Sequence, residues 1–183
     1  MEKNAIGFIE LSSIARGIET ADVILKAADT KLAFARESCP GKYCILFSGQ
    51  VSSVDTALAV GVKAAGNFAV DHVMISHVHP EVMKALYRTS VPAQGGTLGV
   101  MEFYSVTAAI YAADCAVKTA QVELLNLRLG TGIGGKSFVA LTGDNASVQE
   151  AVRVGTLRAG SSGMIVGSAV VSNPSRAVLE SLY

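Results

Sequence analysis

The chain contains an internal repeat, and this repeat constrains the fold more than any other feature of the sequence. When the chain is shifted by 92 positions, residues 6–32 fall on residues 98–124 with nine identities in 27 positions. When it is shifted by 94, residues 41–66 fall on residues 135–160 with ten identities in 26. Sequences of ordinary composition would share about three identities over both segments by chance. The chain is therefore a tandem duplication.

Each repeat predicts the same order of elements. In the first, the hydrophobic pattern predicts strands near residues 6–10, 31–37, 43–48 and 72–78, and helices that begin at Ser13, Ser53 and Pro80. The second repeat adds a capping box of Ser147 and Glu150 and a short helix at Pro174. The order β-α-β-β-α-β is that of the ferredoxin-like, or split βαβ, fold. The sequence thus predicts an α/β (α+β) protein of two ferredoxin-like domains, residues 1–92 and 93–183, with a linker near residues 89–97.

The composition excludes several classes of protein. The chain has 15 basic and 15 acidic side chains, and only 16% of its residues are charged, against about 25% in an average domain. The absence of a basic cluster argues against nucleic-acid binding, and the absence of a long apolar run argues against a membrane span. Three cysteines and no signal pattern favour the reducing cytoplasm. Scarce charge and zero net charge favour an associating chain over an isolated monomer.

Both repeats resemble a known family. The strand Ala5-Ile-Gly-Phe-Ile-Glu10, followed by a helix with Ala21-Asp22 and Lys26-Ala27-Ala28, is similar to the bacterial microcompartment shell domain. Leu98-Gly-Val-Met-Glu102, followed by Ala113-Asp114 and Lys118, is similar to it too. The unpermuted strand order marks the tandem, trimer-forming branch. The turn Cys39-Pro40-Gly41-Lys42, together with the glycine-rich segment before Lys136, most resembles the propanediol-utilisation type.

The resemblance implies a structural, non-enzymatic shell protein. It implies a homotrimer that mimics a hexamer, has a central pore, and tiles with other shell proteins around encapsulated enzymes, redox enzymes among them. It places Lys26 and Lys118 at the tile edge. Read from the residues alone, Asp22/Lys26 and Asp114/Lys118 are i,i+4 pairs, each worth about 0.3–0.5 kcal/mol to a helix. Both interpretations hold together.

A glycine-rich segment of the second repeat matches a nucleotide-binding motif. Residues 130–137 read Gly-Thr-Gly-Ile-Gly-Gly-Lys-Ser and fit the pattern G-x-x-x-x-G-K-[ST]. A phosphate cradle needs a helix directly after this loop, whereas a strand is predicted from Ser137 onward. The segment also aligns with the strand–strand turn ending in Gly41 and Lys42, so a nucleotide site is not expected. The resemblance implies instead that Gly132, Ile133, Gly134 and Gly135 line the pore.

The turn of the first repeat carries a cysteine. Ser38, Cys39, Pro40, Gly41 and Lys42 connect two predicted strands, so a trimer would bring three Cys39 thiols towards one axis. Thiolates are soft ligands suited to iron–sulfur clusters or zinc. The resemblance implies one [4Fe–4S] cluster per trimer, ligated by Cys39 of each chain, with a non-protein ligand on the fourth iron. From the residues alone, a cysteine before Pro-Gly is ordinarily a small turn residue.

The remaining cysteines, glutamates and histidines are expected to have structural roles. Cys44 and Cys115 are predicted to be small buried residues, and Glu10 and Glu102 to be turn residues ahead of a helix. His77 and His79 form either a His-x-His metal site or, in the favoured interpretation, a polar strand end.

The main alternative function is a small-molecule-binding regulatory protein of tandem ferredoxin-like domains. An electron-transfer enzyme subunit would need more cluster ligands than Cys39 supplies.

Overall fold

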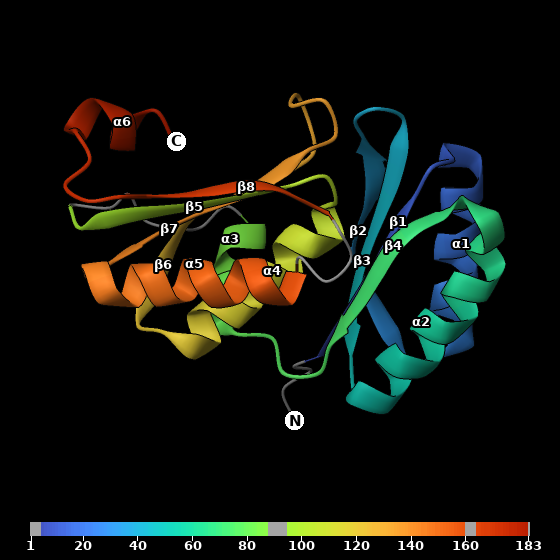
Figure 1. Cartoon of the computed structure of the whole chain (residues 1–183). Coiled ribbons are helices and arrows are strands. Elements are labelled where there is room, and N and C mark those ends of the chain that lie inside the picture. The colour runs from blue at the N-terminus through green and yellow to red at the C-terminus, as the bar shows by residue number, and fades with distance from the viewer. Residues whose placement is uncertain (1–4, 88–94, 160–163, 183) are drawn as a thin grey trace. The chain divides into compact units, whose positions relative to one another are not determined.

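The structure is a computed structural model that describes residues 5–87, 95–159 and 164–182. The chain divides into two compact units, Met1–Val78 and His79–Tyr183. Each unit has a four-stranded antiparallel sheet with two long helices against one face (Figure 1). The predicted fold class is confirmed in both units.

The first unit follows the predicted order of elements. These are β1 (Ala5–Leu11), α1 (Ile14–Ala27), β2 (Thr30–Ser38), β3 (Lys42–Gly49), α2 (Val51–Ala65), a 3-10 turn (Gly66–Phe68) and β4 (Ala69–Ile75). The strand order is β2-β3-β1-β4, and every residue of β1 is buried. Side chains of β1 and β3 meet those of α1 and α2 in one core, which includes Ile9, Ile24, Phe47 and Val54. Because successive side chains of a strand point to opposite faces of the sheet, every second residue of β1 and β3 points to the helices.

The second unit repeats this arrangement and adds a helix at each end. Its elements are α3 (Pro80–Leu86), β5 (Thr97–Phe103), α4 (Val106–Thr119), β6 (Val122–Leu129), β7 (Ser137–Gly143), α5 (Asn145–Ala159), β8 (Ile165–Val171) and α6 (Arg176–Glu180). The strand order β6-β7-β5-β8 matches that of the first unit. Even the irregularity of the hairpin recurs, because the register shifts between Leu32 and Phe34 and again between Leu124 and Asn126. The duplication is thus preserved to the level of strand register.

Helix α3 packs with the second unit, although its sequence belongs to the first repeat. The sequence places the domain boundary after residue 92, whereas the two compact units divide after Val78. Val82, Ala85 and Leu86 of α3 are at most 7% exposed, and α3 packs against α4 and β6. The backbone N–H of His79 also donates to Asp114 Oδ1 at 2.9 Å. These contacts link residues far apart in the sequence, so a repeat alignment cannot predict them.

The predicted helix starts are partly confirmed. Ser13 caps α1, since its hydroxyl accepts from the Arg16 N–H, and Ser105 caps α4 in the same way. Helix α2 begins at Val51, two residues before the predicted Ser53. Strand β4 ends at Ile75 rather than near residue 78, because the chain then turns towards the N-cap of α3 at His79.

The capping box predicted from Ser147 and Glu150 is wrong. The Ser147 hydroxyl donates to Asp144 Oδ2 at 2.5 Å, and the Ser147 N–H donates to Asp144 Oδ1 at 3.0 Å. These hydrogen bonds, the one from the hydroxyl first, hold the pKa of Asp144 below its ordinary value. Glu150 instead forms an ion pair with Arg153 at 2.7 Å. Asp144 immediately precedes the helix and reaches the exposed N–H groups first, as a cap residue does.

The two remaining predictions concern the ends of the second repeat. Residues 88–94 of the predicted linker lie outside the described residues, and β5 begins at Thr97, the last linker position. The helix expected at Pro174 begins at Arg176 with Ser175 as its N-cap. Leu179 of α6 packs on the sheet of the second unit with Leu98 and Ala140.

Candidate functional site

The candidate site of the first unit is the turn that joins β2 to β3. Its residues are Ser38, Cys39, Pro40 and Gly41, and the Gly41 N–H donates to the Ser38 carbonyl at 3.0 Å. Gly41 has a φ of 85°, a conformation that glycine adopts without strain. Cys39 is a free, partly exposed thiol at this turn. The Cys39 thiol is therefore partly accessible at a short turn that a backbone hydrogen bond closes.

The equivalent turn of the second unit is longer and glycine-rich. Between β6 and β7 the chain has positive φ angles at Gly130, Gly132, Gly134 and Gly135, and the Lys136 N–H donates to the Ile133 carbonyl at 3.3 Å. This segment runs into strand β7, and the next helix begins only at Asn145. The predicted absence of a helix after this loop is therefore confirmed, and the loop lacks the geometry of a phosphate cradle.

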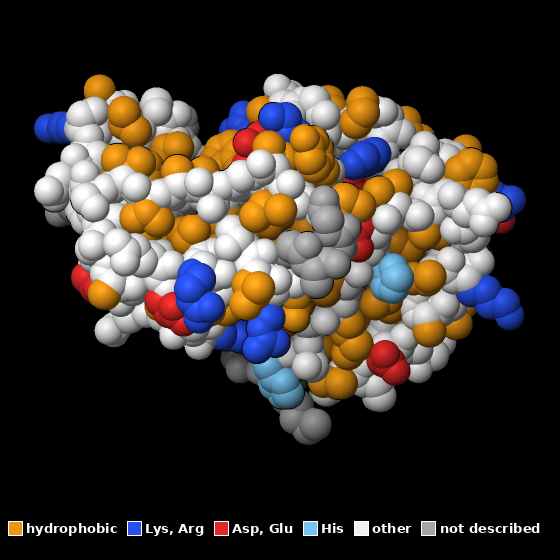
Figure 2. Space-filling view, in the orientation of Figure 1, with side chains coloured by type: hydrophobic (Ala, Val, Ile, Leu, Met, Phe, Trp, Pro, Cys, Tyr) orange, Lys and Arg blue, Asp and Glu red, His pale blue; other side chains and the backbone are white. Residues whose placement is uncertain are grey.

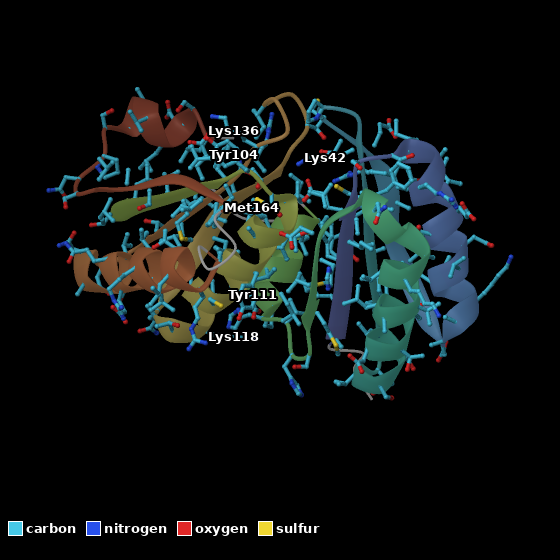
Figure 3. All side chains as sticks on the ribbon, turned by 45° about the vertical axis from the view of Figure 1, so that its right-hand side comes forward. Lys42, Tyr104, Tyr111, Lys118, Lys136 and Met164 are labelled. Atoms are coloured by element: carbon cyan, nitrogen blue, oxygen red, sulfur yellow. The ribbon has the colours of Figure 1, made fainter. Side chains whose placement is uncertain are left out.

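An ion pair lies at the base of each turn. In the first unit Lys42 Nζ is 2.7 Å from Glu10 Oε1, and the Glu10 side chain is fully buried. In the second unit Lys136 Nζ is 2.8 Å from Glu102 Oε1, and both side chains are about 40% exposed. The Glu102 carboxylate raises the pKa of Lys136 by hydrogen bonding and by its charge. In Figure 3, Lys136 and Tyr104 lie at the same end of the second unit.

Sequence reasoning missed these pairs. Glu10 and Glu102 were expected to be turn residues, but both lie within central strands, β1 and β5. The signal was present in the repeat, because Glu10 aligns with Glu102 at one shift and Lys42 with Lys136 at the other. A recurring acid and a recurring base from adjacent strands form a cross-strand pair only in the antiparallel register that the structure shows. Each pair ties the start of β3 or β7 to the central strand.

The other two cysteines do not join the turn. Cys44 is buried in β3, and burial raises its pKa to about 12, with the Glu10 carboxylate acting in the same direction. Cys115 lies on α4, where burial raises its pKa and the Tyr111 hydroxyl is its hydrogen-bond partner. Thiols with raised pKa values are poor metal ligands and poor nucleophiles. Within the described part of one chain, no three His, Cys, Asp or Glu side chains gather as a metal site.

The histidine pair of the sequence lies in the segment that leads into α3. Both residues lie beyond the end of β4, rather than on a strand face. His79 is the N-cap of α3, and its Nδ1 accepts from the Glu81 N–H at 3.3 Å. His77 is exposed. His79 therefore has a structural role at the start of a helix.

The two lysines expected at a tile edge occupy equivalent positions on α1 and α4. Lys26 Nζ is 2.6 Å from Asp22, and both side chains are mostly exposed. Lys118 Nζ is 2.5 Å from Asp114, whose side chain is only 4% exposed. Figure 3 shows Lys118 and Tyr111 on α4, at the end of the unit opposite to Lys136. The local pairing predicted for both lysines is confirmed.

Comparison with known proteins gives a consistent result. The family model of the BMC domain matches residues 5–81 and again residues 97–174. The bacterial microcompartment shell protein PduT of Citrobacter freundii is 37% identical over 170 residues, which cover 93% of this chain and 92% of that protein. The shell protein PduA of Salmonella typhimurium is 31% identical over 80 residues, 44% of this chain and 83% of that protein.

A solved structure extends the likeness to three dimensions. The crystal structure of a microcompartments protein from Desulfitobacterium hafniense DCB superposes with a TM-score of 0.86 at 42% identity, over 96% of this chain and 98% of that one. Among the described residues, no helix is long and apolar enough to cross a membrane. Since the domain model matches both repeats and the likeness spans nearly the whole length, this chain belongs to the bacterial microcompartment shell proteins, as a member with two BMC domains in tandem.

Proposed function

We propose that the chain forms a homotrimeric, pseudohexameric tile of the shell, with a central pore lined by the two turns. The first turn contributes Ser38, Cys39, Pro40, Gly41 and Lys42 from each copy, and the second contributes residues 132–135. The duplication supports this arrangement, because six equivalent units from three chains can surround one axis. The role is structural rather than enzymatic, with other shell proteins and the enclosed enzymes as partners.

We propose further that Cys39 of the three copies holds one [4Fe–4S] cluster at the pore. The carrying observation is the contrast between the thiols of the first unit: Cys39 is partly exposed at a turn, whereas Cys44 is buried with a pKa of about 12. One available thiol per chain suits a threefold ligand set, and thiolate is the ligand that such clusters prefer. When bound, the cluster would take up and release an electron at the shell.

This chain's own residues would set the position of the thiol. Gly41 closes the turn through its hydrogen bond to Ser38. The buried pair of Glu10 and Lys42 fixes the start of β3, three residues from Cys39. A rigid anchor of this kind keeps a ligand in a narrow range of positions, as functional sites require.

The cluster is tested by purification without oxygen. The native chain should be brown, should contain about four irons per trimer, and should give an EPR signal after reduction. Cys39→Ser should lose the iron and keep the trimer, whereas Cys115→Ser, a change at another partly exposed cysteine, should keep both. A colourless, iron-free trimer that Cys39→Ser leaves unchanged would contradict the cluster.

The tile is tested separately from the cluster. Sedimentation should give a mass near three times the chain mass of 18.9 kDa, and electron microscopy should show flat sheets. A monomer under these conditions would contradict the trimer. The regulatory alternative would instead show a stoichiometric small ligand in a thermal-shift screen and no planar assembly.

A further inference from the structure

The ion pair beneath the Cys39 turn is enclosed by protein, whereas its equivalent in the second unit is not. Glu10 of β1 is fully buried, and the Lys42 side chain that contacts it at 2.7 Å is 18% exposed. Lys136 and Glu102 of the second unit are 44% and 39% exposed. Taking two charges out of water costs about as much free energy as their attraction returns. Stability alone therefore does not explain why the charged pair of the first unit is buried.

Lys42 lies at the base of the turn that carries the Cys39 thiol. It is the first residue of β3, and it is paired across the hairpin with Ser38, the last residue of β2. Cys39 follows Ser38 directly, at a Cα–Cα distance of about 3.8 Å. The ion pair is therefore anchored at the base of the same turn as the proposed cluster ligand.

The neighbouring thiol of Cys44 responds to both charges of the pair. Cys44 lies opposite Glu10 in the ladder between β1 and β3. Burial is the largest cause of its raised pKa, the Glu10 carboxylate raises this pKa further, and the Lys42 ammonium lowers it. Charges interact more strongly where protein replaces water. The field of each charge therefore extends beyond the pair, and the two charges act in opposite directions.

Three copies in the proposed tile would bring three such pairs around the pore. Glu10 and Lys42 together have no net charge, whereas Lys42 without the carboxylate would add one positive charge per copy. Reduction of a cluster adds one electron, and net charge nearby is one of the factors that set how readily this happens. Figure 2 shows charged side chains as scattered groups among hydrophobic and other neutral atoms, in keeping with the 16% charged residues of the chain. A change of charge at this pair would therefore have few other charges to mask it.

We propose that Glu10 sets the reduction potential of the [4Fe–4S] cluster at the pore, because its buried carboxylate cancels the charge of Lys42 beside the Cys39 turn. The inference rests on the cluster proposed above and concerns its potential. Glu10 acts through Lys42, so it is a positioning residue and not a ligand. Without the carboxylate, three lysine charges would favour the reduced cluster.

A redox titration of the trimer, purified without oxygen, tests this role. The solution potential is set with dithionite and ferricyanide, and EPR measures the reduced cluster. Glu10→Gln keeps the size of the side chain, removes its charge and leaves Lys42 charged. At a fixed potential the ratio of reduced to oxidised cluster should rise tenfold or more, which for one electron is an upward shift of about 59 mV. The matched change Glu102→Gln, in the exposed pair, should leave the ratio close to that of the native trimer because water screens its charge.

Lys42→Met tests the opposite sign, since it leaves the Glu10 carboxylate without the ammonium and should lower the same ratio. Iron content and trimer mass are measured for every variant. An unchanged ratio in Glu10→Gln and Lys42→Met trimers that hold iron would overturn the inference and leave the cluster in place. Loss of iron from both variants, with iron kept in Glu102→Gln, would assign the pair a purely structural role and overturn it as well. A native trimer without iron would instead contradict the cluster itself.

Discussion

At the scale of single residues, burial decides how much each repeated ion pair contributes to the stability of the folded protein. Glu10 and Glu102 occupy equivalent positions and have equivalent lysine partners at similar distances. The Glu10 side chain is fully buried, however, whereas water reaches both members of the second pair. Removing one partner of a buried pair leaves a charge in a medium of low polarity, whereas an exposed pair contributes little. The two repeats therefore provide a matched comparison.

We expect Lys42→Met to lower the free energy of unfolding by about 3 kcal/mol, because it removes the ammonium from the buried Glu10 carboxylate. Lys136→Met, the same change in the exposed pair, should leave the free energy of unfolding close to the native value. Urea unfolding of both variants at one protein concentration measures the difference. Equal losses in the two variants would show that burial does not set the strength of these pairs.

The buried thiol of Cys44 predicts a dependence of stability on alkaline pH. Burial raises its pKa from an ordinary value of 9.0 to about 12 in the folded protein, so between these values the unfolded chain releases a proton that the folded chain retains. Stability from this group is complete below about pH 9 and falls by up to about 1.4 kcal/mol per pH unit above it.

The variant Cys44→Ala isolates this effect from other groups that titrate in the same range. Between pH 9 and pH 10.5 the native protein should lose about 2 kcal/mol more than the variant. Urea unfolding at each pH measures both proteins. Parallel stability curves would contradict a raised pKa for Cys44.

At the scale of the elements, two helix caps and the positions of the strands were predictable because they depend on residues close in the sequence. Ser13 and Ser105 cap α1 and α4 as their position before an apolar period indicates. The capping box at α5 failed for a local reason as well, since the helix begins at Asn145, so that Asp144 immediately precedes it and Ser147 lies inside its first turn. The sequence prediction chose the Ser147 hydroxyl as the capping acceptor, whereas the Asp144 carboxylate is the acceptor in the structure.

We expect Ser105→Ala to cost about 1 kcal/mol of stability, because the Ser105 hydroxyl accepts from a buried N–H at 3.1 Å. Ser13→Ala should cost less, since water can reach the N–H of Arg16 when the hydroxyl is gone. Thermal unfolding of the two variants ranks them. A larger loss from Ser13→Ala would show that exposure of the cap is not the deciding factor.

At the scale of the whole molecule, the scarcity of charge is explained by assembly. With 16% charged residues and zero net charge, the chain has little electrostatic repulsion to keep copies apart. A shell tile needs sides that meet other tiles, and several weak contacts together hold a sheet. Lys26 is mostly exposed and forms an ion pair with the exposed Asp22, so its removal should not disturb the fold.

We expect Lys26→Ala to abolish or greatly reduce flat sheets in electron microscopy and to keep the trimer in sedimentation. Lys63→Ala, at another position of the first unit, is the control and should form sheets normally. Loss of sheets in both variants would point to a general effect of charge, and normal sheets in both would remove Lys26 from the tile edge.

The sequence by itself determined the duplication, the order of elements in each repeat, the strand–strand turns that carry Cys39 and the glycines, and the likeness to the shell family. These features depend on spacing and periodicity along the chain, which the sequence records directly. The strand that follows its Gly-Lys-Ser motif was predictable as well, because it too depends on residues close in the sequence.

Only the tertiary structure decided that α3 packs against α4 and β6. It alone showed that the recurring glutamate and lysine of each repeat form an ion pair. It also decided which of two equivalent apolar side chains is exposed. Ile18 and Ile110 are the same residue in the same repeat position, yet one is 58% exposed and the other is fully buried. The physical reason is that burial and charge pairing depend on what lies opposite a side chain in space. A duplicated sequence gives both copies the same side chains, and only the folded chain gives them different neighbours.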